Sequence, residues 1–185
     1  MLRRGEKASF VPNAWVFPGG AVDLGDERHS TLATMRVAAA RELFEETGVW
    51  LGTPPAGADA KRLALLAGSL TFDELLAEAP VDFERLVWTS HWITPAGVPK
   101  RFDTYFFLAA VPRDTASSLM GDEATDLLWV RPDEALASLD MVFPTIKNLE
   151  ALRGFRNAYE LIASRIGADI PAIQPVIVDR KIVLP

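Results

Sequence analysis

Three glutamates at helical spacing are the residues of this sequence whose types and positions could do chemistry together. Successive helical residues turn by about 100°, so Glu42, Glu45 and Glu46 would share one face of a helix. Like charges at this spacing weaken a helix, so helix stability does not explain them. A solvated glutamate-rich face is the common explanation of such a pattern. Magnesium and manganese, however, take carboxylate oxygens beside substrate phosphates, so a divalent-metal site is the chemical alternative.

The flanking residues favour the metal-site interpretation because they place the acids on a docked helix. The opposite face collects apolar residues that would pack on a core, namely Ala33, Val37, Ala40, Leu43 and Phe44. Ser30 or Thr31 can cap the start of the helix, and Gly48 can end it in the left-handed conformation. Upstream, the β-prone run 15–18 ends in Gly19-Gly20, where backbone can approach a ligand closely.

These segments together resemble the Nudix box, G-x5-E-x7-R-E-U-x-E-E-x-G-U, in which U is an aliphatic residue. The second half matches at every specified position, in Arg41-Glu42-Leu43-Phe44-Glu45-Glu46-Thr47-Gly48-Val49. The first half departs twice, because Asp26 stands where the family has Glu and residues 27–40 make fourteen spacers instead of seven. An enlarged box of this kind is similar to that of Nudix hydrolases related to peroxisomal acyl-coenzyme A diphosphatases. Further segments resemble that subgroup, at 10–14, 92–95, 101–107 and 129–132.

The resemblance implies an α+β fold of the α/β/α sandwich type, with a mixed β-sheet between helices. We expect one Nudix hydrolase domain over residues 1–185. Met1–Gly5 resembles the tail of a strand that is usually longer in the family, so either the chain begins late or this edge strand is short. A helix from Ala58 and a capping box at Thr71 predict a small helical insertion at about 58–80. Apolar spacing predicts a hairpin from 86 to 111, a buried strand at 127–130 and a last helix with a tail over about 144–185.

The implied function is hydrolysis of a diphosphate bond in a nucleoside diphosphate linked to another group, such as coenzyme A or acyl-coenzyme A. ADP-ribose, NADH or capped RNA remain alternative substrates, and a non-catalytic nucleotide sensor is the alternative class. Because Arg41 and all three acids are present, we favour an enzyme. The resemblance implies Mg²⁺ or Mn²⁺ held by Glu42, Glu45, Glu46 and the Gly20 carbonyl, with Arg41 orienting one of the helix glutamates.

Other residues are weaker candidates for the site. A carboxylate must accept a proton from the attacking water. Glu42 or Glu45 of the helix set could do so, and the resemblance makes Glu123 a further candidate, so the choice between them stays open. Asp26 could assist a metal, directly or through water. Lys100 and Arg101, at the hairpin rim, could hold a remote phosphate, although rim charges are usually only solvated.

Composition limits the alternatives. A length of 185 residues, 49% of them hydrophobic, suits one well-packed domain. The absence of cysteine excludes disulfides and thiolate metal sites and is compatible with a cytoplasmic location. A net charge of −6 argues against a broad nucleic-acid surface. No apolar run is long enough to span a membrane and no leader is evident. We therefore expect a small-molecule substrate, and a homodimer is an open possibility.

Overall fold

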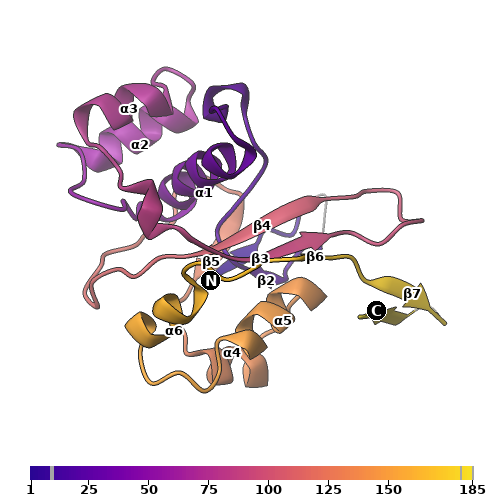
Figure 1. The fold of residues 1–185 in the computed structure, drawn as a ribbon. Helices are drawn as coiled ribbons and strands as arrows, with labels where there is room; N and C mark the ends of the chain where they lie inside the picture. The colour runs from indigo at the N-terminus through magenta and orange to yellow at the C-terminus, as the bar shows by residue number, and fades with distance from the viewer. Residues whose placement is uncertain (9–10, 180, 185) are drawn as a thin grey trace.

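The computed structural model describes residues 1–8, 11–179 and 181–184, in which the strands form two three-stranded sheets and a separate hairpin (Figure 1). The first sheet has the order β2-β1-β5 and is antiparallel, with β1 Leu2–Arg4, β2 Trp15–Val16 and β5 Ala124–Leu127. The second has the order β4-β3-β6, with β3 Val87–Ile93, β4 Asp103–Leu108 and β6 Ala172–Ile173. Strand β3 runs antiparallel to β4 and parallel to β6, so this sheet is mixed. The hairpin joins β7 Val176–Val178 and β8 Lys181–Val183.

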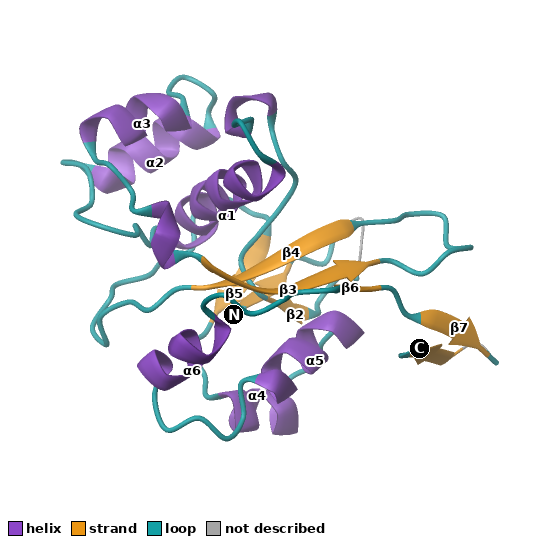
Figure 2. Ribbon diagram, in the orientation of Figure 1, coloured by secondary structure: helices purple, strands orange, loops and turns teal. Residues whose placement is uncertain are grey.

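Helices cover both sides of these strands (Figure 2). On one side lie α1 Thr31–Thr47, α2 Ala58–Leu66 and α3 Phe72–Glu78. On the other lie α4 Pro132–Ser138, α5 Phe143–Ala151 and α6 Ala158–Arg165. Two 3₁₀ turns, η1 Leu24–Asp26 and η2 Phe83–Arg85, complete the elements used below. The α/β/α arrangement is as predicted, although the strands form two sheets in place of one. No helix in the described part of the chain is both long and apolar enough to cross a membrane.

Helix α1 begins and ends where its capping residues predicted. The Ser30 hydroxyl accepts a hydrogen bond from the Ala33 N–H at 3.3 Å. Gly48, at φ 73°, donates its N–H to the Phe44 carbonyl at 2.8 Å. Val37, Ala40 and Phe44 are buried in the core, so the helix docks by the predicted face. The glutamates are thereby directed away from the core.

The insertion packs directly on α1. Helices α2 and α3 fall within the predicted range, and Thr71 opens α3 with the expected capping box. Leu65 and Phe72 are buried in the same hydrophobic cluster as Phe44 and Trp50. The Trp50 ring lies 5.0 Å from Phe44 and 5.6 Å from Phe72, measured between ring centroids. The insertion therefore shares its core with the helix that carries the glutamates.

Two sequence predictions were wrong in the C-terminal half. The strand expected at 127–130 lies at 124–127, because β1 pairs with it only from Leu2 to Arg4, and Trp129 is 62% exposed. The last helix, expected to continue through Phe155, ends at Ala151, since Gly154 adopts the left-handed φ of 86°. A further helix, α6, starts after the Asn157 cap. The predicted hairpin is confirmed as β3 and β4.

Candidate active site

Three successive residues of the loop after β2, 19–21, each contact a side chain of α1 that belongs to the glutamate face or to Arg41. The Gly19 N–H donates to Glu46 Oε2 at 2.7 Å. Gly20 lies so close to Glu42 that a Cβ at this position would overlap the Glu42 carboxylate. The Ala21 carbonyl accepts from Arg41 Nη2 at 2.8 Å. Gly20 is thus needed for the close approach of the backbone to Glu42, whereas a Cβ at Gly19 would meet nothing within 4 Å.

Arg41 joins the loop to the helix. It is 6% exposed, and its Nη1 donates to Glu42 Oε1 at 3.0 Å and to Glu45 Oε2 at 2.9 Å. On the other side, its Nε and Nη2 donate to Asp26 Oδ1 and Oδ2 at 3.0 and 2.8 Å. Arg41 was expected to orient one helix glutamate, and the structure shows it bonded to two.

Asp26 is the buried anchor of this network. It is 1% exposed, and the η1 turn brings it beneath Arg41. Its Oδ2 also accepts the Asp23 N–H at 2.8 Å. Both carboxylate oxygens are therefore engaged within the protein and hold Arg41, and the expected metal contact of Asp26 stays a prediction. A buried carboxylate–arginine pair of this kind is favourable only when its remaining hydrogen-bonding groups are satisfied, as they are here.

Burial makes ionisation of the glutamates costly. It raises the pKa of Glu42 to about 7, although the Arg41 charge opposes this shift. It likewise raises the pKa of Glu46 to about 7, with further increases from the charges of Glu42 and Glu123. The pKa of Glu45 is also raised by burial, against the influence of Arg41. A cation bound between them would favour the ionised forms.

We call Glu42, Glu45 and Glu46 the carboxylate cluster and ask whether it fits a metal ion. Within residues 1–8, 11–179 and 181–184, no three acidic or histidine side chains already converge as a complete set of metal ligands. Arg41 holds the Glu42 and Glu45 carboxylates, and Gly19 holds that of Glu46. Three adjacent acids beside an approaching glycine backbone are nevertheless hard oxygen donors of the kind that Mg²⁺ and Mn²⁺ prefer. The residues therefore fit such an ion.

Glu123 lies near the cluster, whereas the two hairpin cations do not. Glu123 precedes β5, its carbonyl accepts the Gly5 N–H at 2.9 Å, and its charge acts on Glu46. The loop that carries Lys100 and Arg101 extends away from α1 (Figure 1). Arg101 donates to the Thr94 carbonyl of its own loop at 3.2 Å. The structure brings Glu123 towards the acids and leaves the substrate-binding role of Lys100 and Arg101 a prediction.

Arg62 is a residue near the cluster that the sequence analysis missed. It belongs to α2, is 0% exposed, and donates from Nε to the Glu45 carbonyl at 2.9 Å. Burial lowers its pKa, against the charges of Asp59 and Glu46. The burial of Arg62 could have been predicted from its position, because Arg62 lies at helical spacing between Ala58 and Leu65, in the stripe of α2 that faces the core.

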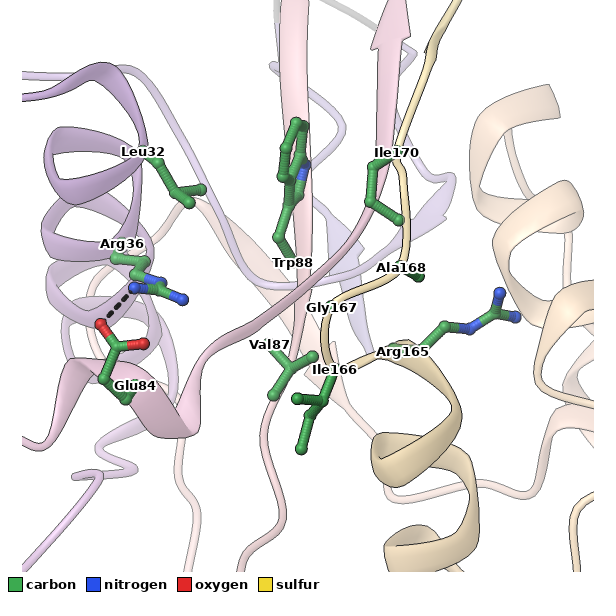
Figure 3. A pocket seen from close by; sticks show the side chains of 10 residues that line it. All are labelled: Leu32, Arg36, Glu84, Val87, Trp88, Arg165, Ile166, Gly167, Ala168 and Ile170. Carbon is green, nitrogen blue, oxygen red and sulfur yellow. Dashed lines mark hydrogen bonds and ion pairs between the residues drawn. The ribbon is translucent and has the colours of Figure 1, made fainter.

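A pocket of about 390 Å³ lies elsewhere, between α1, β3 and the segment after α6 (Figure 3). Arg36 at its edge donates to Glu84 at 2.5 Å and to the Leu86 carbonyl at 3.1 Å. The Arg165 guanidinium points away from the other side chains drawn, and it donates to the Ala151 carbonyl at 3.3 Å. The described residues that line this pocket include no member of the carboxylate cluster, so we assign the pocket no part in the chemistry.

Known proteins resemble this chain in sequence and in fold. The chain is 37% identical over 147 residues to a Caenorhabditis elegans protein provisionally named nudix hydrolase 7, covering 74% of this chain and 47% of that protein. It is 26% identical over 201 residues to acyl-coenzyme A diphosphatase NUDT19 of Xenopus laevis, covering 74% and 53%. It is 27% identical over 203 residues to the human protein of the same name, covering 75% and 54%. The chain thus spans about half the length of the curated relatives it matches.

A solved structure gives the same result for the fold. The crystal structure of a NUDIX hydrolase from Alicyclobacillus acidocaldarius superposes with a TM-score of 0.75 at 27% identity, covering 88% of this chain and 86% of that one. It confirms the predicted α+β fold. The NUDIX domain family model matches residues 1–151, which include the whole box and Glu123. The resemblance seen in the box is therefore confirmed, and the chain belongs to the Nudix family.

Proposed function

We propose that this chain hydrolyses a diphosphate bond in a nucleoside diphosphate linked to another group. The single observation that carries this proposal is the Arg41 network. One buried guanidinium, anchored on Asp26, holds Glu42 and Glu45 side by side against the Gly19-Gly20 loop. A solvated surface cluster needs no such anchor. The arrangement is what a site requires when several acids must be held together in a fixed geometry.

The carboxylate cluster and the Gly20 carbonyl would hold Mg²⁺ or Mn²⁺. Such ions, when bound, neutralise the charge of the diphosphate and lower the pKa of a bound water. Arg41 keeps Glu42 and Glu45 oriented through its paired donors. The Gly19 N–H fixes the direction of the Glu46 carboxylate. The protein's own residues thus supply orientation, and the ion supplies charge.

The proton of the attacking water needs a carboxylate acceptor. Glu123 is our candidate because it is exposed and lies at the end of a loop before β5. Its charge also contributes to the raised pKa of Glu46. The oxygens of Glu42 and Glu45 that face Arg41 are already engaged in hydrogen bonds. Glu123 would receive the proton on a carboxylate oxygen, while the leaving phosphate departs on the opposite side.

For the substrate we propose coenzyme A or an acyl-coenzyme A. Two relatives bear the name acyl-coenzyme A diphosphatase, and the enlarged box points the same way. Lys100 and Arg101 are proposed to contact a phosphate of that substrate remote from the carboxylate cluster. The homodimer and the cytoplasmic location remain predictions.

A product-release assay tests the proposal. The purified chain is incubated with coenzyme A, an acyl-coenzyme A, ADP-ribose, NADH or capped RNA, each with Mg²⁺ or Mn²⁺, and the products are separated by chromatography. We expect coenzyme A compounds to be split at the diphosphate into two phosphate monoesters. Preference for another compound would refute the substrate but keep the reaction. A folded, metal-binding protein that cleaves none of them would support the nucleotide-sensor alternative.

A further inference from the structure

The last turn of α1, which carries Glu45 and Glu46, is fixed by a cation from the insertion. Arg62 Nε donates to the Glu45 carbonyl at 2.9 Å, and Arg62 Nη1 donates to Ser118 Oγ at 3.2 Å. The Glu45 carbonyl belongs to the final turn, where carbonyls have no donor four residues ahead within the helix. Arg62 supplies that donor, and its positive charge lies at the negative end of the helix dipole.

Neighbouring contacts tighten the same turn. The Ser118 N–H donates to the Thr47 carbonyl at 2.9 Å, so Ser118 bonds both Arg62 and the helix end. Gly48 turns the chain away in the left-handed conformation, and a Cβ there would lie 3.1 Å from Arg62 Nη1. The guanidinium therefore fills the space beneath Gly48 with little room to move.

Stability alone does not account for an arginine at this place. Arg62 is fully buried, and the structure shows no ion pair for it within hydrogen-bonding distance among the described residues. Its Nη2 has no hydrogen-bond partner there either. Burying a charge that only neutral groups contact is costly, and an apolar side chain in the core-facing stripe of α2 would avoid that cost. The hydrogen bonds to the Glu45 carbonyl and to Ser118, which is itself bonded to the end of α1, are what the arginine adds.

We propose that Arg62 is a positioning residue for the carboxylate cluster. Glu45 is held at two points, by Arg41 at its carboxylate and by Arg62 at its carbonyl. Glu46 follows it in the same turn, so a displacement of the backbone at Glu45 redirects both carboxylates. The insertion thereby serves the metal site as well as covering the core. This inference depends on the proposed function, because it assumes that the cluster binds a divalent ion.

The test compares two substitutions of Arg62 with a control on the same helix. Arg62→Met removes the donors while keeping a long side chain, and Arg62→Lys keeps the charge but lacks the fork that reaches Glu45 and Ser118 together. Leu65→Ala, also buried on α2, disturbs the packing of the insertion but removes no hydrogen bond to the end of α1. Calorimetry measures the Kd for Mn²⁺, and thermal melting measures Tm. Hydrogen exchange of the metal-free protein reports the amides of residues 47–50.

We expect Arg62→Met to raise the Kd for Mn²⁺ by about 10-fold or more, as loss of a supporting contact around a metal ligand typically does. Exchange at residues 47–50 should quicken, and Arg62→Lys should fall between this variant and wild type. Leu65→Ala should lower Tm and leave the Kd within about twofold. An unchanged Kd in Arg62→Met, or an equal change in Leu65→Ala, would overturn the inference. If wild type itself bound no Mn²⁺, the proposed function would fail first, and this inference with it. Should Arg62→Met not fold, Arg62→Lys is judged by the same comparison.

Discussion

Asp26→Asn would leave Arg41 buried with its anchor neutralised. The change keeps the size of the side chain and removes one negative charge at a position that is 1% exposed. Three donor–acceptor contacts join the two residues, at 2.8, 3.0 and 3.2 Å. An amide can accept with one oxygen only, so at least one Arg41 donor loses its acceptor. Because Arg41 has little access to water, that loss is not recovered by solvation.

The expected loss of stability follows from this geometry. Removing one partner of a buried ion pair costs about 3–5 kcal/mol. Glu42 and Glu45 still neutralise Arg41 in the variant, so we take the lower limit, about 3 kcal/mol. For a chain of this size each kcal/mol corresponds to about 2–4 °C, which gives a fall in Tm of about 6–12 °C.

Asp23→Asn is the matched control. Asp23 lies 3.7 Å from the same Arg41 Nη1, but its side chain is 70% exposed, so the identical chemical change should cost well under about 1 kcal/mol. Both variants are melted without metal and followed by circular dichroism. If Asp26→Asn lowered Tm by less than about 2 °C, or if the two variants lowered Tm equally, the buried pair would not anchor the site.

Three further predictions concern the acids themselves. Glu45→Gln and Glu46→Gln should each lower kcat/KM by about 100-fold or more while the protein stays folded, because amide oxygens bind hard cations poorly; unfolding in a melting curve would contradict this. Burial raises the pKa of Glu42 and of Glu46 to about 7 in the native protein, whereas a glutamate in the unfolded chain has a pKa of about 4.3. Between these two pH values the native protein therefore binds protons that the unfolded chain has released. The metal-free protein should therefore lose stability as the pH rises from about 4.5 to about 7, as Tm measured across that range will show, and the slope should flatten in a Glu42→Gln, Glu46→Gln double variant. Glu123→Gln should lower kcat by about 100-fold while KM stays within a few-fold of the wild-type value, as steady-state kinetics will show. An unchanged kcat with intact Mn²⁺ binding would mean that a helix glutamate, and not Glu123, is the general base.

Local features of the fold were predictable because their causes are local. Ser30 and Gly48 mark the ends of α1 by interactions within a few residues, and Thr71 does the same for α3. The face of α1 that enters the core follows from its apolar spacing alone. The three acids could therefore be assigned from the sequence to the face directed away from the hydrophobic core, although the Glu42 and Glu45 side chains are only 15% and 17% exposed.

The remaining features depend on contacts between distant residues, and spacing alone does not identify the partners in those contacts. From the sequence, Asp26 is a loop acid like its neighbours. Only the η1 turn brings it under Arg41, which lies fifteen residues further along the chain. The apolar run around Trp129 resembles a strand, but strand length depends on what β1 offers as a partner. Arg62 was unremarked because a single arginine in a short helix is ordinarily solvated. Only the packing of α2 on α1 buries it.

The link between Asp26 and Arg41 shows that the two halves of the box are joined in space and not by a fixed count of residues. The fourteen spacers are divided between residues 27–30, which follow η1, and residues 31–40, the first ten of α1. A search pattern with a rigid gap would pass over this chain. A pattern that allows a longer gap, and aspartate at the acidic position, would recover it, together with other chains whose acid and arginine meet in the same way.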